Sequence, residues 1–276
     1  MKDKAEEKVS RFYNTLGWEV KGGVTEDAKR WEDLRTCARE YVSKCRLRVL
    51  KYIPKNGANM LDMASGPIQY DEYLEYSKNF KKRYCVDLSS DALEQAKNKI
   101  GEHGVFLHGS FFELPLEKNF FDCAISLHTI YHMDKNKQED AVRKLVDVVK
   151  PGKPVVIVYS NPNSLVYFLK LLIPLGLMRR ITNSIFRYKK DSKYAGQSSL
   201  YFYPHPIKWW NKFDDIADVK VQPWRSFSAD FQKIIIPDNI IGKKVFDSLF
   251  YLEGLFPNVF ARFCQYPMII LTKKEK

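Results

Sequence analysis

Residues 61–70 read LDMASGPIQY, the pattern of a buried strand that ends in a ligand-binding turn. A dinucleotide-binding turn has the form G-x-G-x-x-G, because glycines let the backbone approach a pyrophosphate. The corresponding positions here are Ala64, Gly66 and Gln69, so two of the three glycines are missing. A pyrophosphate would meet the Cβ of Ala64, and the turn therefore disfavours NAD and FAD.

A smaller ligand without phosphate groups demands less of this turn. Gly66 can take a positive φ and let a ligand pass close to the chain, while Asp62 supplies a carboxylate for a cation at the strand end. Asp87 ends the next apolar run and can accept hydrogen bonds from both hydroxyls of a ribose. Two carboxylates without a phosphate cradle suit S-adenosylmethionine, which carries a sulfonium, an ammonium and a ribose. The alternative is that either aspartate caps the following helix.

Strand patterns alternate with helical patterns after residue 57. Apolar runs typical of strands cover residues 58–64, 82–88, 104–110, 120–128 and 153–160, and helical patterns cover 89–100 and 134–150. This alternation predicts parallel βαβ units in a doubly wound sheet. Two closing strands are expected at 218–227 and 266–273, with a helical segment between them. The predicted fold class is α/β, a Rossmann-like, mostly parallel, seven-stranded sheet.

The chain divides where this pattern changes. We expect an N-terminal helical cap at 1–54 and a cofactor-binding core at 55–162. An apolar and basic insert follows at 163–215, and the closing strands with their helical insert occupy 216–276. Ligands of doubly wound sheets bind beyond the carboxyl ends of the strands, so the site is expected at the turns that follow the core strands.

Composition excludes a disordered chain and leaves several partner classes open. The 276 residues are 45% hydrophobic, enough for a substantial core. Lys and Arg outnumber Asp and Glu by 45 to 33, and the net charge of +12 favours anionic partners such as nucleic acid, membrane head groups or acidic substrates. The five cysteines show no paired spacing, and the charged first residues lack the apolar core of a signal peptide. A cytoplasmic location with reduced thiols is therefore expected.

Five segments resemble, in order, the motifs of class I S-adenosylmethionine-dependent methyltransferases, most closely the small-molecule group of methyltransferase type 11. They are LDMASGPIQY, CVDLSSDALEQA, GSFFELPL, FFDCAISLHTIYHM and VVKPGKPVVIV. Each motif alone is weak, but five at fitting spacings are specific, and together they cover residues 57–162. The sequence departs from the family pattern at Ala64, Ile68 and Ser110.

The resemblance implies where the cofactor binds. The stretch 62–66 would hold its methionine end, Asp87 its ribose and Leu88 its adenine. Ser110 stands where the family often has an acidic residue facing the adenine amino group, and Phe111 beside it would offer a backbone N–H and apolar cover. The predicted cofactor contacts are Asp62, Ala64, Ser65, Gly66, Asp87, Leu88, Ser110, Phe111 and Leu127.

Three residues after the fourth strand are candidates for the chemistry. The segment SLHTIYH places His128, Tyr131 and His132 beside the expected methyl position. Methyl transfer is an in-line displacement that depends mainly on positioning, and a histidine can take a proton from a hydroxyl or amine near neutral pH. His132 is also compatible with simple packing. H-x-x-x-H could bind a metal on a helix face, but no third ligand has a fixed spacing, so no metal is predicted.

Aromatic and basic residues outside the core are candidates for acceptor contacts. Tyr13 and Trp18 could close over the site, because aromatic faces attract a sulfonium. His205, within SLYFYPHPIKWW, and Arg225, at the end of a closing strand, could also contact the acceptor, Arg225 through a phosphate or carboxylate. Core packing is the alternative for Trp18 and for the aromatic stretch.

The insert carries an apolar run, LVYFLKLLIPLGLM at 165–178, and then a basic cluster at 179–193. The run is too short to span a membrane, but the pair is typical of a segment that rests on an anionic membrane surface. The alternative is a substrate-capping subdomain whose apolar side faces the sheet. Basic residues interleaved with apolar ones, without an RNA-binding module, disfavour nucleic acid as a partner.

The predicted function is methyl transfer from S-adenosylmethionine to a small-molecule, glycan or lipid-like acceptor. O-methylation is favoured because histidines are close by and no acidic cluster that would bind an amine is visible. Two alternatives stay open: a non-catalytic membrane or protein adaptor that retains the fold, and an RNA methyltransferase. The expected location is cytoplasmic, with peripheral contact to the inner membrane as an option.

Overall fold

The computed structural model describes residues 4–18, 20–21, 24–165 and 200–275. Among these residues, seven strands form one sheet in the order β5-β4-β3-β6-β7-β9-β8, in which β9 runs antiparallel to the other six strands. The strands are β3 (Gly57–Met63), β4 (Phe80–Asp87), β5 (Gly104–His108), β6 (Cys123–Leu127), β7 (Pro154–Val158), β8 (Ala217–Arg225) and β9 (Tyr266–Lys273). The predicted α/β fold with a seven-stranded, mostly parallel sheet is confirmed.

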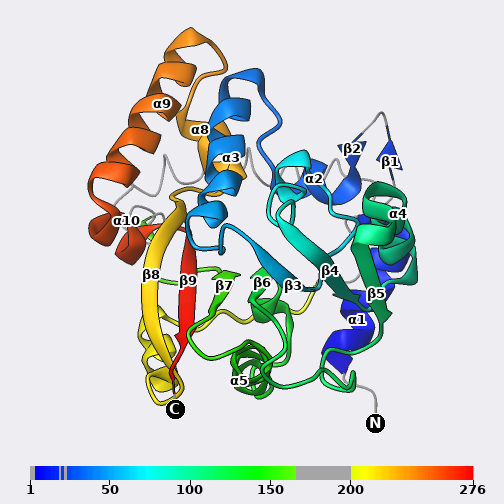
Figure 1. The fold of residues 1–276 in the computed structure, drawn as a ribbon. Helices are drawn as coiled ribbons and strands as arrows, with labels where there is room; N and C mark the ends of the chain where they lie inside the picture. The colour runs from blue at the N-terminus through cyan, green and yellow to red at the C-terminus, as the bar shows by residue number, and fades with distance from the viewer. Residues whose placement is uncertain (1–3, 19, 22–23, 166–199, 276) are drawn as a thin grey trace.

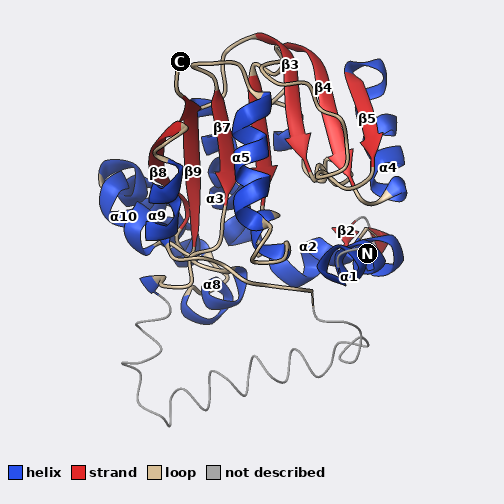
Figure 2. Ribbon diagram, turned by 90° about the horizontal axis from the view of Figure 1, so that it is seen from below, coloured by secondary structure: helices blue, strands red, loops and turns tan. Residues whose placement is uncertain are grey.

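The central strands are apolar on both faces, as expected for parallel strands that helices cover on both sides. On one face, Leu61 and Ile157 pack in a core cluster with helix α5 (Gln138–Val148). On the other face, Met60 and Val156 belong to a second cluster, which includes residues that follow helix α3. Figure 2 shows α5 lying across the sheet, and these two layers fix the sheet on which the site is built.

Helices flank the sheet along its length. Helix α9 lies beside α3, as Figure 1 shows, and the two share a buried cluster. Besides α5, the helices that flank the sheet are α3 (Thr36–Leu47), α4 (Ser90–Ile100), α8 (Ala229–Ile235), α9 (Ile240–Leu255) and α10 (Pro257–Phe263). Short 3₁₀ turns occur at Arg48–Lys51, Asp71–Tyr73, Gly101–His103, Ile130–His132 and Ile207–Phe213.

The N-terminal cap runs from α1 (Lys4–Phe12) to α2 (Glu26–Trp31). A π-helical turn, Tyr13–Gly17, follows α1, and a two-stranded hairpin, β1 (Val20–Lys21) and β2 (Val24–Thr25), precedes α2. The N-terminal segment expected as a helical cap at 1–54 therefore also contains a hairpin. Figure 2 shows the cap crossing the carboxyl-terminal edge of the sheet near β3, β4 and β5.

Most of the predicted insert lies outside the described residues, including nearly all of the apolar run at 165–178 and the whole basic cluster at 179–193. Within the described part of the chain, no helix combines the length and hydropathy needed to cross a membrane. All five cysteines are buried and free.

Candidate active site

A cavity of about 330 Å³ opens at the carboxyl ends of β3, β4 and β6, beneath the N-terminal cap. This is the edge at which doubly wound sheets bind their ligands. Most of the predicted site residues line the cavity, namely Tyr13, Trp18, Asp62, Ala64, Ser65, Gly66, Asp87, Leu88, Phe111, Leu127, His128, Tyr131, His132 and Arg225. Ser110 and His205 are not among the lining residues.

The turn after β3 keeps the backbone shape of a glycine-rich loop although it has one glycine. The φ angles are +59° at Ala64, +54° at Gly66 and +50° at Ile68. A left-handed conformation costs a non-glycine residue about 1–2 kcal/mol. The Ile68 side chain offsets this cost, because it is fully buried in a cluster with Cys85 and Leu93. The turn therefore stays open toward the cavity.

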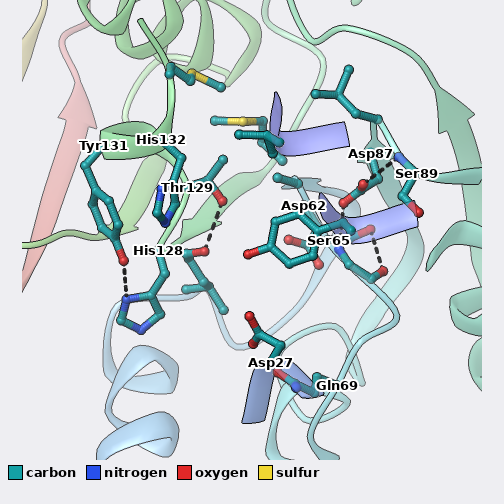
Figure 3. A pocket seen from close by; sticks show the side chains of 18 of the residues that line it. Asp27, Asp62, Ser65, Gln69, Asp87, Ser89, His128, Thr129, Tyr131 and His132 are labelled. Atoms are coloured by element: carbon teal, nitrogen blue, oxygen red, sulfur yellow. Dashed lines mark hydrogen bonds between the residues drawn. The ribbon is translucent and has the colours of Figure 1, made fainter. Parts of the chain in front are cut away.

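Asp87 fixes the turn to the end of β4. Its Oδ2 accepts a hydrogen bond from the Gly66 N–H at 2.9 Å, and its Oδ1 accepts one from the Ser89 N–H at 2.9 Å. The cap of α4 is Ser89, whose hydroxyl accepts from the Ala92 N–H. Burial raises the pKa of Asp87 to about 6, against the effect of the Ser89 and Gly66 N–H groups. At neutral pH the carboxylate is therefore largely ionised on the cavity wall (Figure 3).

A carboxylate from the cap stands beside Ser110. The Ser110 hydroxyl donates to Glu6 Oε1, on α1, at 2.7 Å, and Glu6 itself lines the cavity between the cap and Phe111. This pairing turns the serine away from a lining position. Glu6 was not predicted as a site residue, because nothing in the helical pattern of α1 indicates which turn of the sheet it contacts.

Asp62 is engaged by a neighbouring strand. Its Oδ2 accepts from Arg83 Nη2 at 2.5 Å and from Arg83 Nε at 3.1 Å, and both side chains are almost fully buried. This ion pair leaves Asp62 without free charge for the cation that it was expected to bind. The signal for it was available, since an arginine inside a buried strand needs a buried acidic partner.

Three residues after β6 form the wall opposite the turn. His128 Nδ1 lies 3.1 Å from the Tyr131 hydroxyl, and the His128 backbone has a φ of +58°, a strained conformation of the kind that clusters at functional sites (Figure 3). His132 Nδ1 lies 2.7 Å from the Tyr201 carbonyl, so this nitrogen carries the proton and Nε2 keeps a lone pair.

Both histidines are held in the neutral form. Burial, helped by the charge of Arg225, puts the pKa of His128 well below its usual value. Burial also lowers the pKa of His132, although its bond to Tyr201 acts in the opposite direction. At pH 7 each imidazole is therefore uncharged, and burial makes each a weaker base than a histidine in water.

The cap brings two aromatic rings and an unpredicted acid to the turn. The Tyr13 and Trp18 rings stack at 4.7 Å, and Trp18 lies so close to Gly66 that a Cβ there would meet it at 2.9 Å. Asp27, on α2, points into the same region (Figure 3). Burial and the nearby Glu32 raise the pKa of Asp27 to about 7, while hydrogen bonds from Gln69 and Tyr13 lower it. No sequence signal identified Asp27, since an acid in the first helical turn is common.

The far end of the cavity combines charge with aromatic rings. Arg225 Nη1 lies 2.6 Å from Glu32 Oε2, and Arg46 approaches the other Glu32 oxygen at 3.7 Å while covering the Tyr70 ring. Glu32 is thus neutralised by two arginines. His205 lies outside the wall, because its ring stacks on Trp209 at 4.4 Å. Among the described residues, no three His, Cys, Asp or Glu side chains gather as metal ligands.

Comparison with known proteins agrees with this geometry. Residues 61–157 match the profile of a family described as a methyltransferase domain. No curated protein matches the chain. Fold, cavity and profile define the class: the chain carries a methyltransferase domain of the S-adenosylmethionine-dependent type.

Three solved structures illustrate the shared fold. A methyltransferase dependent on S-adenosylmethionine from Archaeoglobus fulgidus is 18% identical, with a TM-score of 0.53 over 86% of this chain and 94% of that one. The N-methyltransferase NodS from Bradyrhizobium japonicum, in complex with S-adenosylhomocysteine, is 11% identical, with a TM-score of 0.53 over 99% and 100%. Phosphoethanolamine N-methyltransferase 2 from Haemonchus contortus is 13% identical, with a TM-score of 0.51 over 84% of this chain, which spans only 53% of that protein.

Proposed function

We propose that the chain transfers a methyl group from S-adenosylmethionine to the hydroxyl of a small-molecule, glycan or lipid-like acceptor. The observation that carries the proposal is the turn after β3, which keeps three positive φ angles and is bonded to the carboxylate of Asp87 on the cavity wall.

The residues present fit the cofactor. Asp87 would bind the ribose, Leu88 and Phe111 would cover the adenine, and the open turn at Gly66 would admit the amino-acid end. Glu6 would supply the carboxylate on the adenine side that Ser110 lacks. When bound, S-adenosylmethionine supplies a methyl group activated by a sulfonium.

The chain's own contribution to the reaction is positioning and proton acceptance. His128 and His132 are neutral and line the cavity, so either can take the proton of an acceptor hydroxyl. The Tyr131 hydroxyl fixes the His128 ring. Rings on the far wall, including Tyr70 and Tyr266, suit the face of a sugar or an apolar group.

We propose a hydroxyl acceptor although two acidic side chains that could bind an amine line the cavity. Asp27 and Glu32 both line the cavity, although neither was expected there. Glu32 is paired with Arg225 and Arg46 and offers no free charge to an amine. The neutral histidines favour an acceptor that loses the proton of a hydroxyl group when it is methylated.

Titration calorimetry with S-adenosylhomocysteine tests the cofactor site. Wild-type protein is expected to bind with a micromolar Kd, and Asp87→Ala to bind at least about tenfold more weakly, because a charge-assisted hydrogen bond is lost. Asp91→Ala is the matched control, since Asp91 lies four residues later in the first turn of α4 and outside the cavity wall. Absence of binding by the wild type, or equal affinity in Asp87→Ala, would refute the site.

Transfer of labelled methyl groups tests the acceptor class. Protein is incubated with methyl-labelled S-adenosylmethionine and a cell extract separated into small-molecule, lipid and RNA fractions. Label in the small-molecule or lipid fraction that mass spectrometry assigns to a methyl ether supports the proposal, whereas label on nitrogen or in RNA contradicts it. Peripheral membrane attachment stays a prediction of the sequence, and flotation with liposomes that contain anionic lipid examines it.

A further inference from the structure

Five carboxylates line the cavity, and their partners differ. Asp62 is paired with Arg83, and Glu32 is paired with Arg225. Asp87 accepts two backbone N–H groups, and Glu6 accepts the hydroxyl of Ser110. Each of these four has a defined partner within the protein.

Asp27 differs from Asp62 and Glu32, each of which pairs with an arginine. Its carboxylate accepts hydrogen bonds from Gln69 and Tyr13, while the nearby charge of Arg30 lowers its pKa and that of Glu32 raises it. Within the described residues it has no arginine contact as short as those of Asp62 and Glu32. It is held against the turn, because Gln69 follows Gly66 by three residues and also donates to Thr25, the cap of α2. A half-buried carboxylate without an ion-pair partner is a suitable place for a cation supplied by a ligand.

Trp18, another residue of the cap, carries a hydrogen-bond donor near the turn at Gly66. Its Nε1–H is buried and has no hydrogen-bond partner in the described part of the protein. The indole ring lies over Gly66, and the ring of Tyr13 stacks on it. Buried donors in proteins are normally paired, so an unpaired indole N–H in a residue that lines the cavity calls for an acceptor from outside the protein.

We propose that the N-terminal cap recognises the zwitterionic amino-acid end of the cofactor, with Asp27 binding its ammonium and the indole N–H of Trp18 binding its carboxylate. This inference rests on the proposed function. An amino acid carries one positive and one negative group on the same carbon, and the cap presents one carboxylate and one N–H donor beside the turn at Gly66. The role expected of Asp62 thus passes to a residue of another element.

Two ligands that differ only in this end test the inference. S-adenosylhomocysteine has the amino-acid tail, and 5′-methylthioadenosine has the same nucleoside and sulfur without it. Calorimetry at pH 8, where Asp27 is ionised, compares the wild type with Asp27→Asn and Trp18→Phe. Asp27→Asn is expected to weaken S-adenosylhomocysteine about 10- to 100-fold, and Trp18→Phe about tenfold, because each removes a hydrogen bond to a charged group. Both variants should bind 5′-methylthioadenosine as the wild type does.

Glu26→Gln is the matched control, because Glu26 is the preceding residue of α2, pairs with Lys29 at 3.0 Å and does not line the cavity. It should leave both affinities unchanged. The inference is overturned if Asp27→Asn binds S-adenosylhomocysteine normally, or if both ligands weaken by the same factor.

A third ligand distinguishes the two positive groups of the donor. S-adenosylmethionine adds the sulfonium charge to the same tail. If Asp27→Asn weakens S-adenosylmethionine alone, Asp27 faces the sulfonium and the assignment to the ammonium is wrong. If the wild type binds none of the three ligands, it is the proposed function that fails.

Discussion

At the scale of single residues, the cofactor turn shows how packing replaces glycine. Ala64 and Ile68 both hold positive φ angles, but only Ile68 is fully buried. The strain at Ile68 is therefore offset by contacts with α4 and β4, whereas Ala64 has a single methyl group to offset it. Substitution by glycine should consequently change the free energy of unfolding in opposite directions at Ala64 and Ile68.

Ala64→Gly is expected to raise the free energy of unfolding by about 0.5–1 kcal/mol, since relief of left-handed strain exceeds the added flexibility of the unfolded chain. Ile68→Gly should lower it by about 2–3 kcal/mol, because a buried side chain is lost. Urea denaturation measures both values. Stabilisation by Ile68→Gly, or clear destabilisation by Ala64→Gly, would contradict this view of the turn.

Asp27 should make the ligand-free protein less stable as the pH rises. Its pKa is about 7 in the folded state and about 3.9 in an unfolded chain. The folded state thus holds the proton more tightly, so its stability is complete below pH 4 and decreases as the pH rises through 7. Glu32 and Arg30 are the charges that act on it, with Gln69 and Tyr13 as hydrogen-bond donors.

Asp27→Asn removes this penalty. We expect the variant to exceed the wild type by about 1–2 kcal/mol at pH 8, after allowance for water in the cavity, and by less at pH 5. Chemical denaturation without ligand, at the two pH values, makes the comparison. A variant that is less stable than the wild type at pH 8 would show that the Asp27 carboxylate already has a stabilising partner.

At the scale of elements, a buried network holds the far wall of the site. Glu253, on α9, forms an ion pair with Arg48 Nη2 at 2.7 Å and accepts a hydrogen bond from the Tyr41 hydroxyl at 2.9 Å. It also accepts from the Ser226 N–H at 3.1 Å, directly after the end of β8. The network therefore joins α3, α9 and β8, and it fixes Arg225 next to Ser226.

Glu253→Ala should lower the free energy of unfolding by about 3–5 kcal/mol, because it leaves Arg48 buried without its partner. Glu40→Ala is the control on α3, where the carboxylate pairs with Lys44 at the surface. Its urea midpoint should equal that of the wild type. If the urea midpoint of Glu253→Ala also equals that of the wild type, the network does not hold these elements together.

At the scale of the whole molecule, the sheet was predictable because its signals are local. Each central strand is an apolar run closed by a turn, and β9 was predicted at 266–273, the bounds that it has. The strand-end positions of Asp87 and His128 followed from the same rule. The division of the chain at 54, 162 and 215 stays a prediction.

The acidic residues of the cavity that were not predicted depend on contacts that are not local in the sequence. Glu6, Asp27 and Glu32 reach the cavity because the cap folds across the strand ends, and this placement depends on contacts far apart in the sequence. The partner of Asp62 was missed for a related reason, since Arg83 lies on the adjacent strand. Periodicity predicts elements, whereas only tertiary contacts show which carboxylates are already paired.

A crystal structure of the protein with S-adenosylhomocysteine tests the central claim most directly. The account predicts that both ribose hydroxyls lie about 2.6–3.0 Å from the Asp87 carboxylate oxygens, with the amino-acid end beside Gly66. A ligand bound elsewhere on the molecule, or a ribose turned away from Asp87, would contradict it.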